Sequence, residues 1–546
     1  MKPDLDRFNS RRSTVYAPRG VVATSQPLAA EAGAAVLRDG GNAFDAAVAT
    51  AAALNVVEPT STGLGGDVFA CYRTADGDVG GMRASGGAPG DATRERVREA
   101  VADGDRNGDV SYGADRDRDG VSMPDHGPHT VTVPGTARGW EATVERFGRR
   151  SLATVLAPAV RYAREGYPVT EVVAAQWQHA EQLFTDDNAR EAFLFDGRSP
   201  DPGQTVRLPR LADSLEQIAE HGADVVYEGE IADAIAETVQ SKGGFMTVED
   251  LAGFEVEWPD PLSTSYDGCE VFELGPNNQG QIALEALNIA AEVDAGTQPY
   301  DDPERVHRFV ESMKLAFHDG HYHVTDPEYE TVPPLHSRAY ARERAAEIGE
   351  TPLTDVQVGT PSAPGEDADT VLLCVADEAG NVVSFINSRF AGFGSGLVAG
   401  ETGIALQNRG ASFSLSPDHP NRLAPGKRPF HTLVPALARL GPDDWLAFGV
   451  MGGYMQPQGH LQVLANLLDY DTGLQAALDA PRWRYRADGT LAVEERLPNA
   501  AKLARRGHDV RVLPPSQFGG AQAARWQDGT LSGATEPRKD GQVSGL

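Results

Sequence analysis

Cysteine is scarce in this sequence, and long apolar runs are missing from it. The three cysteines, Cys71, Cys269 and Cys374, lie far apart. They are too few and too scattered for a disulfide framework or a zinc-binding cluster. No stretch approaches the roughly 18 consecutive apolar residues that a membrane-spanning helix needs. We therefore expect a chain that folds without disulfides and without a transmembrane segment.

Positive charge is also in short supply. Lys and Arg number 48 against 79 Asp and Glu, which gives a net charge of −31. So acidic a surface argues against nucleic acid or an anionic membrane as a partner, because both repel it. The acidity is spread along the chain, which favours a solvated surface of the halophilic kind, with a merely acidic protein as the alternative. The pair Arg11-Arg12 is not followed by the apolar segment of an export signal, so we expect a cytoplasmic protein.

The length of 546 residues allows two to four domains or one large α/β body. Small apolar residues predict a buried helix over residues 43–55, and an apolar stripe predicts another over residues 303–317. Residues 90–127 form a polar, Asp-rich excursion that we expect to be a surface loop. It contains the first half of a calcium-loop pattern, but His126 stands where the bidentate Glu is needed, which argues against calcium.

Two further patterns resemble ligand-binding sites, but each lacks features that such a site needs. The glycine turns at residues 63–66 and 392–396 lack the Lys-Ser/Thr pair and the helix context of phosphate and dinucleotide loops. The histidines His318, His321 and His323 follow the predicted helix, and we interpret them as an exposed helix end rather than a metal site. We expect no cofactor and no metal.

The junction at Thr370 organises the chain. Residues 352–369 contain a Pro/Gly-punctuated segment that indicates a mobile linker. From Thr370 to Ala376 the sequence becomes an apolar strand, and residues 382–387 predict the strand that pairs with it. Taken alone, a threonine at such a junction is an ordinary strand start, since β-branched residues favour strands.

A set of short motifs makes the junction more specific. Each motif is weak alone, but together they occur in the order found in one family. They are residues 40–47 (GGNAFDAA), 63–66 (GLGG), 133–135 (VPG), 247–251 (TVEDL), 427–429 (KRP), 452–453 (GG), 479–482 (DAPR) and 537–538 (PR). With these motifs the chain resembles the gamma-glutamyltransferase family along nearly its whole length. Residues 10–13 (SRRS), 407–410 (QNRG) and 455–460 (MQPQGH) make it most similar to the gamma-glutamyltransferase-like branch.

The resemblance implies an α/β (α+β) fold, the four-layer αββα sandwich of N-terminal-nucleophile hydrolases. It also implies a precursor that cuts itself between Asp369 and Thr370. The products would be a helix-rich large subunit, residues 1–369, and a strand-rich small subunit, residues 370–546, which stay together. A threonine hydroxyl needs an adjacent base. Once Thr370 is the N-terminus, its own α-amine, with a usual pKa of about 7.7–8, can serve as that base.

Further roles follow from position within the family. Ser388 matches a second hydroxyl residue that contacts the nucleophilic oxygen. Gly452 and Gly453 match the glycine pair whose amide groups form an oxyanion hole, which suits acyl transfer. As a structural alternative, the two glycines form only a tight turn between a strand and a helix.

The residues expected to bind substrate depart from the best-known members. Ser85 stands in place of the Arg that holds the glutamyl α-carboxylate, and Ser412 in place of the Asp that holds the α-amine. The paired serines after Arg-Pro are replaced by His431-Thr432. Losing an Arg–carboxylate clamp should weaken glutamyl binding by several kcal/mol unless it is replaced. Arg409 could bind an acidic acyl group from another direction.

Three functional hypotheses remain. The first is a self-processing amidase or acyltransferase acting on gamma-glutamyl amides such as glutathione. The second keeps the machinery but changes the acyl group, toward an acylase for glutaryl, other dicarboxylic or aliphatic amides. The third is a non-catalytic scaffold on the same fold. The partners we expect are a small amide or peptide substrate and the two subunits of one precursor.

Overall fold

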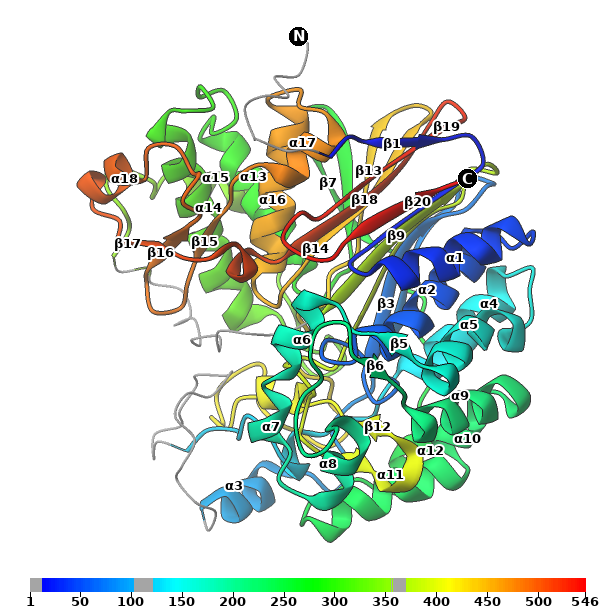
Figure 1. Ribbon diagram of the computed structural model, residues 1–546. Coiled ribbons are helices and arrows are strands. Elements are labelled where there is room, and N and C mark those ends of the chain that lie inside the picture. Colours follow the sequence, from blue (N-terminus) through cyan, green and yellow to red (C-terminus); the bar gives the residue numbers. More distant parts are fainter. Residues whose placement is uncertain (1–11, 103–120, 355, 357–369) are drawn as a thin grey trace.

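Two antiparallel sheets stacked face to face form the centre of the molecule (Figure 1). The computed structural model describes residues 12–102, 121–354, 356 and 370–546. The first sheet has six strands, in the order β20 (Gln542–Gly545), β2 (Gly20–Thr24), β9 (Val371–Asp377), β10 (Val382–Ser388), β3 (Asp67–Arg73) and β4 (Val79–Ala84). The second has seven, in the order β1 (Val15–Ala17), β19 (Thr530–Thr535), β18 (Gly520–Gln527), β14 (Asp444–Met451), β13 (Ala436–Gly441), β8 (Cys269–Glu273) and β7 (Leu262–Tyr266).

Strand β9 is buried on both faces. Leu372 and Cys374 point into the apolar layer between the two sheets. Val371 and Leu373 point the other way, into the core beneath the helices. A strand covered on both sides needs apolar residues at every position, because successive side chains alternate between its faces. This is why the sequence after Thr370 is a continuous apolar run, as predicted.

Helices cover the outer face of the six-stranded sheet. They are α1 (Pro27–Arg38), α2 (Ala43–Val57), α4 (Thr136–Phe147) and α5 (Leu152–Glu165). Every residue of α2 is buried, which confirms the predicted buried helix. Small side chains let its neighbours approach closely: a Cβ atom on Gly33 of α1 would lie 2.1 Å from Thr50 Oγ1 of α2. Asn42 begins α2 through a reciprocal capping box with Asp45.

A second helical layer covers the seven-stranded sheet. It consists of α13 (Gly280–Glu292), α14 (Pro303–His323), α15 (Arg338–Ala345), α16 (Met455–Leu468), α17 (Leu474–Asp479) and α18 (Ala500–Arg506), with a small sheet of β15 (Trp483–Tyr485), β16 (Leu491–Val493) and β17 (Val510–Val512). The prediction that the helix from Pro303 ends near Phe317 is wrong, because α14 continues through Gly320 to His323. Gly320 permits close packing instead of ending the helix: a Cβ atom there would lie 2.2 Å from the Ile282 side chain.

The remaining elements surround one end of the sandwich, in the lower part of Figure 1. They are α3 (Arg94–Ala102), α6 (Glu171–Trp177), α7 (Ala180–Leu183), α8 (Asp187–Phe193), α9 (Pro209–His221), α10 (Asp224–Tyr227), α11 (Glu230–Ser241), α12 (Val248–Ala252), β5 (Tyr167–Pro168), β6 (Thr205–Val206), β11 (Val398–Ala399) and β12 (Ile404–Ala405). Helix α3 corrects the expectation that residues 90–127 are all loop. No helix in the described part of the chain has the length and hydropathy to span a lipid bilayer.

Both sheets mix strands from the two sides of residue 370. In the six-stranded sheet, β9 pairs with β2 on one side and with β10 on the other, and β10 pairs with β3. In the seven-stranded sheet, β13 pairs with β8 and β19 with β1. The two helical layers and the two sheets make the predicted four-layer αββα fold. Neither part of the chain completes either of these two large sheets alone.

Candidate active site

Thr370 and Ser388 lie at adjacent strand ends in the six-stranded sheet. Thr370 immediately precedes β9, and Ser388 is the last residue of the neighbouring strand β10. Their hydroxyl oxygens are 3.4 Å apart, a contact longer than the roughly 2.5–3.0 Å of an ordinary O–H···O hydrogen bond. Both residues are buried. Ser388 Oγ also accepts a 2.9 Å hydrogen bond from the amide of Phe390, whose φ is positive at 83°. Asp369 lies outside the described residues.

Gly452 and Gly453 form the turn from β14 to α16. Their φ angles are 113° and 52°, in the region that favours glycine. Their carbonyl groups accept the first hydrogen bonds of the helix, from Met455 and Gln456. Within the described chain, neither glycine amide donates a hydrogen bond to another backbone group. Amide groups without a backbone acceptor just before a helix form a site that favours negative charge. The turn expected as the structural alternative is therefore present together with two available donors.

A buried charged network lies beside Ser388. It consists of Asp67, Gln407, Arg409, His431 and Thr432, each of which is fully buried. Asp67 begins β3 and is the direct partner of Ser388 in the pairing of β3 with β10. The Oδ2 atom of Asp67 lies 3.0 Å from Nε2 of His431, and its Oδ1 accepts a 3.0 Å hydrogen bond from Gln407 Nε2. The network thus starts one strand away from the two hydroxyl groups.

The hydrogen bonds determine where the proton of His431 lies. His431 Nδ1 accepts a 3.2 Å hydrogen bond from the amide of Leu433. A neutral imidazole with Nδ1 as acceptor carries its proton on Nε2, which donates to Asp67. Burial lowers the pKa of His431 well below its usual value, and the nearby Arg409 acts in the same direction. Burial raises the pKa of Asp67 to about 7, against the opposing effect of Arg409.

Arg409 is the cation of this network. Its Nη1 donates a 2.8 Å hydrogen bond to Thr432 Oγ1, and its guanidinium lies 4.4 Å from the ring centre of Phe390. Its Nε and Nη2 atoms are buried and have no hydrogen-bond partner in the described chain. Burial lowers the pKa of Arg409 to about 10, so the group stays charged at neutral pH. A buried cation with two unused donor atoms is a strong point of attraction for an anionic group.

Gln279 connects the charged network to the glycine turn. Its Nε2 donates to the carbonyl oxygen of Thr432 at 2.5 Å and to that of Gly453 at 3.0 Å. Polar contacts thereby join the predicted substrate residues Arg409, His431 and Thr432 with the predicted oxyanion glycines.

Ser85 and Ser412 are the predicted residues with the fewest contacts. Ser85 directly follows β4, and Ser412 ends a short 3-10 helix, Arg409–Ser412. Both are nearly buried, and neither hydroxyl has a hydrogen-bond partner in the described chain. Gly135 joins Ser85 to the network, because its amide donates to Asp67 Oδ1 at 3.2 Å and a Cβ atom on it would lie 2.7 Å from the Ser85 amide.

A model of one protein family matches this chain over residues 29–546, and its description is gamma-glutamyltranspeptidase. The chain belongs to the gamma-glutamyltranspeptidase family. As a member of it, the protein is an enzyme, a hydrolase of the N-terminal-nucleophile fold.

Proteins with different names are similar to this chain over nearly its whole length. The glutathione hydrolase-like YwrD proenzyme of Bacillus subtilis is 36% identical, and the match covers 98% of this chain and 99% of that protein. The oxamate amidohydrolase proenzyme of Klebsiella pneumoniae is 35% identical over 98% and 99% of the two chains. The solved structure of cephalosporin acylase from Bacillus halodurans is 44% identical, covers 100% of this chain and 99% of its own, and superposes with a TM-score of 0.88.

Three polar residues of this gamma-glutamyltranspeptidase-family site escape sequence reasoning. Asp67, Gln279 and Gln407 hold the network together, yet only Gln407 stands in a motif that the sequence singles out. The signal for Asp67 is an acidic residue at the start of an apolar strand, directly after the glycine turn at residues 63–66. Its partner His431 lies 364 positions away, so no local pattern reveals the pair.

Proposed function

We propose that this protein is an amide hydrolase that activates itself by cleavage between Asp369 and Thr370. The uncut chain has an amide nitrogen at Thr370, which cannot act as a base. Cleavage turns it into an α-amine next to the hydroxyl group. The observation that carries the proposal is the placement of Thr370: its hydroxyl is 3.4 Å from that of Ser388, at the start of a central strand of this fold.

In the reaction, the α-amine of Thr370 takes the proton of Oγ1, which attacks the carbonyl carbon of the amide. The negative charge that develops on the carbonyl oxygen is stabilised by the amides of Gly452 and Gly453. The amine product leaves with the proton, and an ester remains on Thr370. Water, or an acceptor amine, then attacks that ester and releases the acyl group. Ser388 supplies a second hydroxyl beside Oγ1 throughout.

The acyl group carries a carboxylate, because Arg409 offers a buried cation with two unpartnered nitrogen atoms. Gamma-glutamyl amides such as glutathione are the first candidate substrates. They meet this requirement, and relatives named as glutathione hydrolases support them.

A second candidate is an acylase for dicarboxylic monoamides that lack the amine, such as glutaryl amides. Ser412 favours it: the position expected to hold an α-amine has a neutral hydroxyl, where an ammonium group would gain little. Relatives named acylase, 34% identical, support the same direction.

A denaturing gel tests the proposed activation. Wild-type protein should give two bands, for residues 1–369 and 370–546. Thr370→Ala should remain one uncut chain without amidase activity, while Thr370→Ser, which keeps a hydroxyl, should still be cut. An uncut wild type with no activity would favour the scaffold alternative, and turnover by Thr370→Ala would overturn the role of Thr370.

A panel of anilides tests the acyl group. Gamma-glutamyl, glutaryl and unsubstituted acyl anilides differ only in the amine and the carboxylate. Faster cleavage of the first two than of the third supports a carboxylate contact, and faster cleavage of the glutaryl compound favours the second candidate. Equal kcat/KM for all three would refute the assignment of Arg409.

A further inference from the structure

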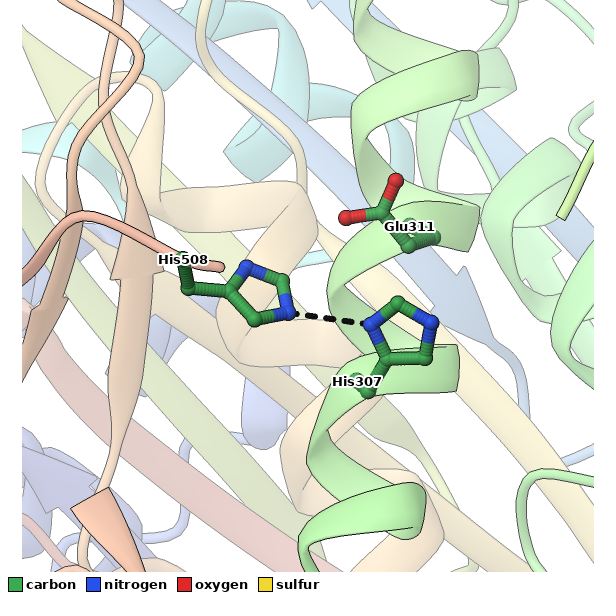
Figure 2. Close-up of side chains that lie close together, drawn as sticks. All are labelled: His307, Glu311 and His508. Carbon is green, nitrogen blue, oxygen red and sulfur yellow. Dashed lines mark hydrogen bonds between the residues drawn. The ribbon is translucent and has the colours of Figure 1, made fainter. Parts of the chain in front are cut away.

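Two histidines and a glutamate meet far from Thr370, in the helical layer that covers the seven-stranded sheet (Figure 2). His307 and Glu311 come from α14, and His508 lies between α18 and β17. Nδ1 of His307 is 2.9 Å from Nε2 of His508, and one potential ligand atom from each of the three side chains lies within 4.8 Å of the others. All three residues are buried. Two imidazole groups and a carboxylate thus face one another out of water.

The surroundings of His307 fix its lone pair toward the centre of this group. Its Nε2 lies 2.9 Å from the carbonyl oxygen of Gly349, which can only accept. The proton of a neutral His307 is therefore on Nε2, and Nδ1 faces His508 with a free lone pair. Metal-bound histidines almost always donate their second ring N–H to a carboxylate, a backbone carbonyl or water, and His307 has a backbone carbonyl there.

Glu311 is held in place by hydrogen bonds from Leu353 and Lys314. Its Oε2 accepts a 2.8 Å hydrogen bond from the amide of Leu353, and its Oε1 accepts one of 2.8 Å from Lys314 Nζ. It stands one helical turn after His307, so the two side chains share a face of α14 (Figure 2). The carboxylate is oriented before any ion arrives.

We propose that His307, Glu311 and His508 bind a divalent transition-metal ion, with Zn²⁺ as the best fit. Two imidazole nitrogens and one carboxylate oxygen suit Zn²⁺, whereas Ca²⁺ and Mg²⁺ prefer oxygen ligands alone. The ion takes the place of the proton between the two rings. The imidazole of His508 then carries its proton on Nδ1 instead of Nε2, so it stays neutral and no net proton is released.

The site is independent of the proposed amidase function and has a structural role. Its ligands come from both sides of residue 370, because His307 precedes that residue and His508 follows it. A bound ion would therefore tie the two parts of the chain together whether or not the chain is cut. The sequence alone predicts no metal here, since its closely spaced histidines are others: His318, His321 and His323.

Lys314 sets the affinity of the site. Its ammonium neutralises Glu311 without metal, and it adds positive charge close to a bound cation. Lys314→Met removes this competitor and leaves a buried carboxylate in need of a cation. We expect this variant to bind Zn²⁺ at least about tenfold more tightly than wild type, because like charges repel one another more strongly in a buried site than in water.

Metal analysis of the whole protein tests the site. Protein stripped with a chelator is dialysed against Zn²⁺ in excess Mg²⁺, which occupies the acidic surface, and the bound zinc is then counted. We expect one tightly bound zinc per chain in wild type, and a loss of affinity of about 100-fold or more in His307→Gln and His508→Gln. His221→Gln, at an exposed histidine on α9, is the matched control and should bind as wild type.

Co²⁺ in wild-type protein gives an answer that does not depend on how the variants fold. A site with two imidazoles and a carboxylate produces the intense visible absorption of four- or five-coordinate Co²⁺, and one equivalent of Zn²⁺ removes it. The proposal would be overturned if Co²⁺ gave only the pale spectrum of a six-coordinate ion. It would also be overturned if wild type bound no stoichiometric zinc, or if folded His307→Gln and His508→Gln bound zinc as wild type does. So would a Lys314→Met variant that is less stable than wild type and gains no affinity for Zn²⁺.

Discussion

The two sides of the candidate active site are built in opposite ways. The hydroxyl–glycine side, made of Thr370, Ser388, Gly452 and Gly453, has small groups, a long contact of 3.4 Å between its two hydroxyls, and two glycine amides that donate to no backbone group in the described chain. The charged network around Asp67, Arg409 and His431 has short hydrogen bonds between fully buried groups. The first side keeps its two glycine amides available, whereas the charged network satisfies most of its polar atoms internally and leaves Nε and Nη2 of Arg409 without a partner in the described chain.

The difference separates chemistry from recognition. A nucleophile and an oxyanion hole need atoms whose contacts strengthen only during the reaction. A network of buried charges, in contrast, costs desolvation and is stable only when its members satisfy one another. Substitutions on the hydroxyl–glycine side should therefore change kcat, and those in the charged network should change substrate choice and stability. Four variants test this division, and they are described from the largest expected effect to the smallest.

Gly452→Ala should have the largest effect. Gly452 has a φ of 113°, which alanine rarely adopts, and an added Cβ atom would lie 3.1 Å from Gly519. The turn must shift and move the amide groups, so we expect kcat to fall about 10²- to 10³-fold, the loss seen when an oxyanion-hole donor is removed. The control is Gly473→Ala, where a Cβ atom meets open space, and it should keep its activity. Normal kcat in Gly452→Ala would contradict the assignment of the turn.

Arg409→Met should reduce kcat/KM for carboxylate-bearing anilides about 10²-fold, because hydrogen bonds to charged groups contribute roughly 1.5–3 kcal/mol. The unsubstituted acyl anilide should lose much less. Arg409→Lys keeps the charge but not the forked set of donors, so its kcat/KM for carboxylate-bearing anilides should lie between those of wild type and Arg409→Met. Equal losses for charged and neutral substrates would mean that Arg409 only supports the fold.

Asp67→Asn should change how stability depends on pH. The pKa of Asp67 is about 7 in the folded protein and near 3.9 when unfolded, so the folded state binds more protons between these values. Stability contributed by this group is therefore lost as pH rises from about 4 to 7. Between pH 5 and pH 7, the free energy of unfolding measured with urea should fall by about 2 kcal/mol more for wild type than for Asp67→Asn. Parallel curves for the two proteins would show that Asp67 is ionised throughout.

Ser388→Ala should have the smallest effect. It removes a 3.4 Å contact to Thr370 and the acceptor for the Phe390 amide, so we expect kcat to fall about 5- to 10-fold. Ser384→Ala, on the same face of β10, is the matched control. Ser384 binds Phe448 and Ala436 of the other sheet, so that variant should lose stability and keep kcat. The same change in kcat for both would remove Ser388 from the chemistry.

Local patterns were enough for the parts of the fold that repeat a local rule. The apolar run after Thr370 predicted β9, and the alanines of residues 43–55 predicted the buried helix α2. The order of short motifs predicted the family, and with it the αββα layers. These features depend on the period of burial along one element, which a single sequence displays.

Features that depend on partners far away in the sequence could not be predicted from local patterns. Gly320 looks like a helix stop, and only the position of Ile282 on α13 explains why the helix passes through it. The role of Asp67 depends on its interactions with His431 and Arg409, and the role of His307 depends on its contact with His508. These partners lie far apart in the sequence. Such residues are recognised only when the fold has placed their partners.

The interleaving of strands has a consequence for the life of the cut enzyme. Before cleavage, the strands on both sides of residue 370 belong to one chain, so they find one another at a rate independent of concentration. After the proposed cleavage, the same sheets would have to be reassembled from two separate molecules, and refolding would become a bimolecular event that dilution opposes. The cut protein would then be protected by the slowness of its unfolding rather than by an equilibrium. Each molecule would fold once, as a precursor, and its working lifetime would end with its first complete unfolding.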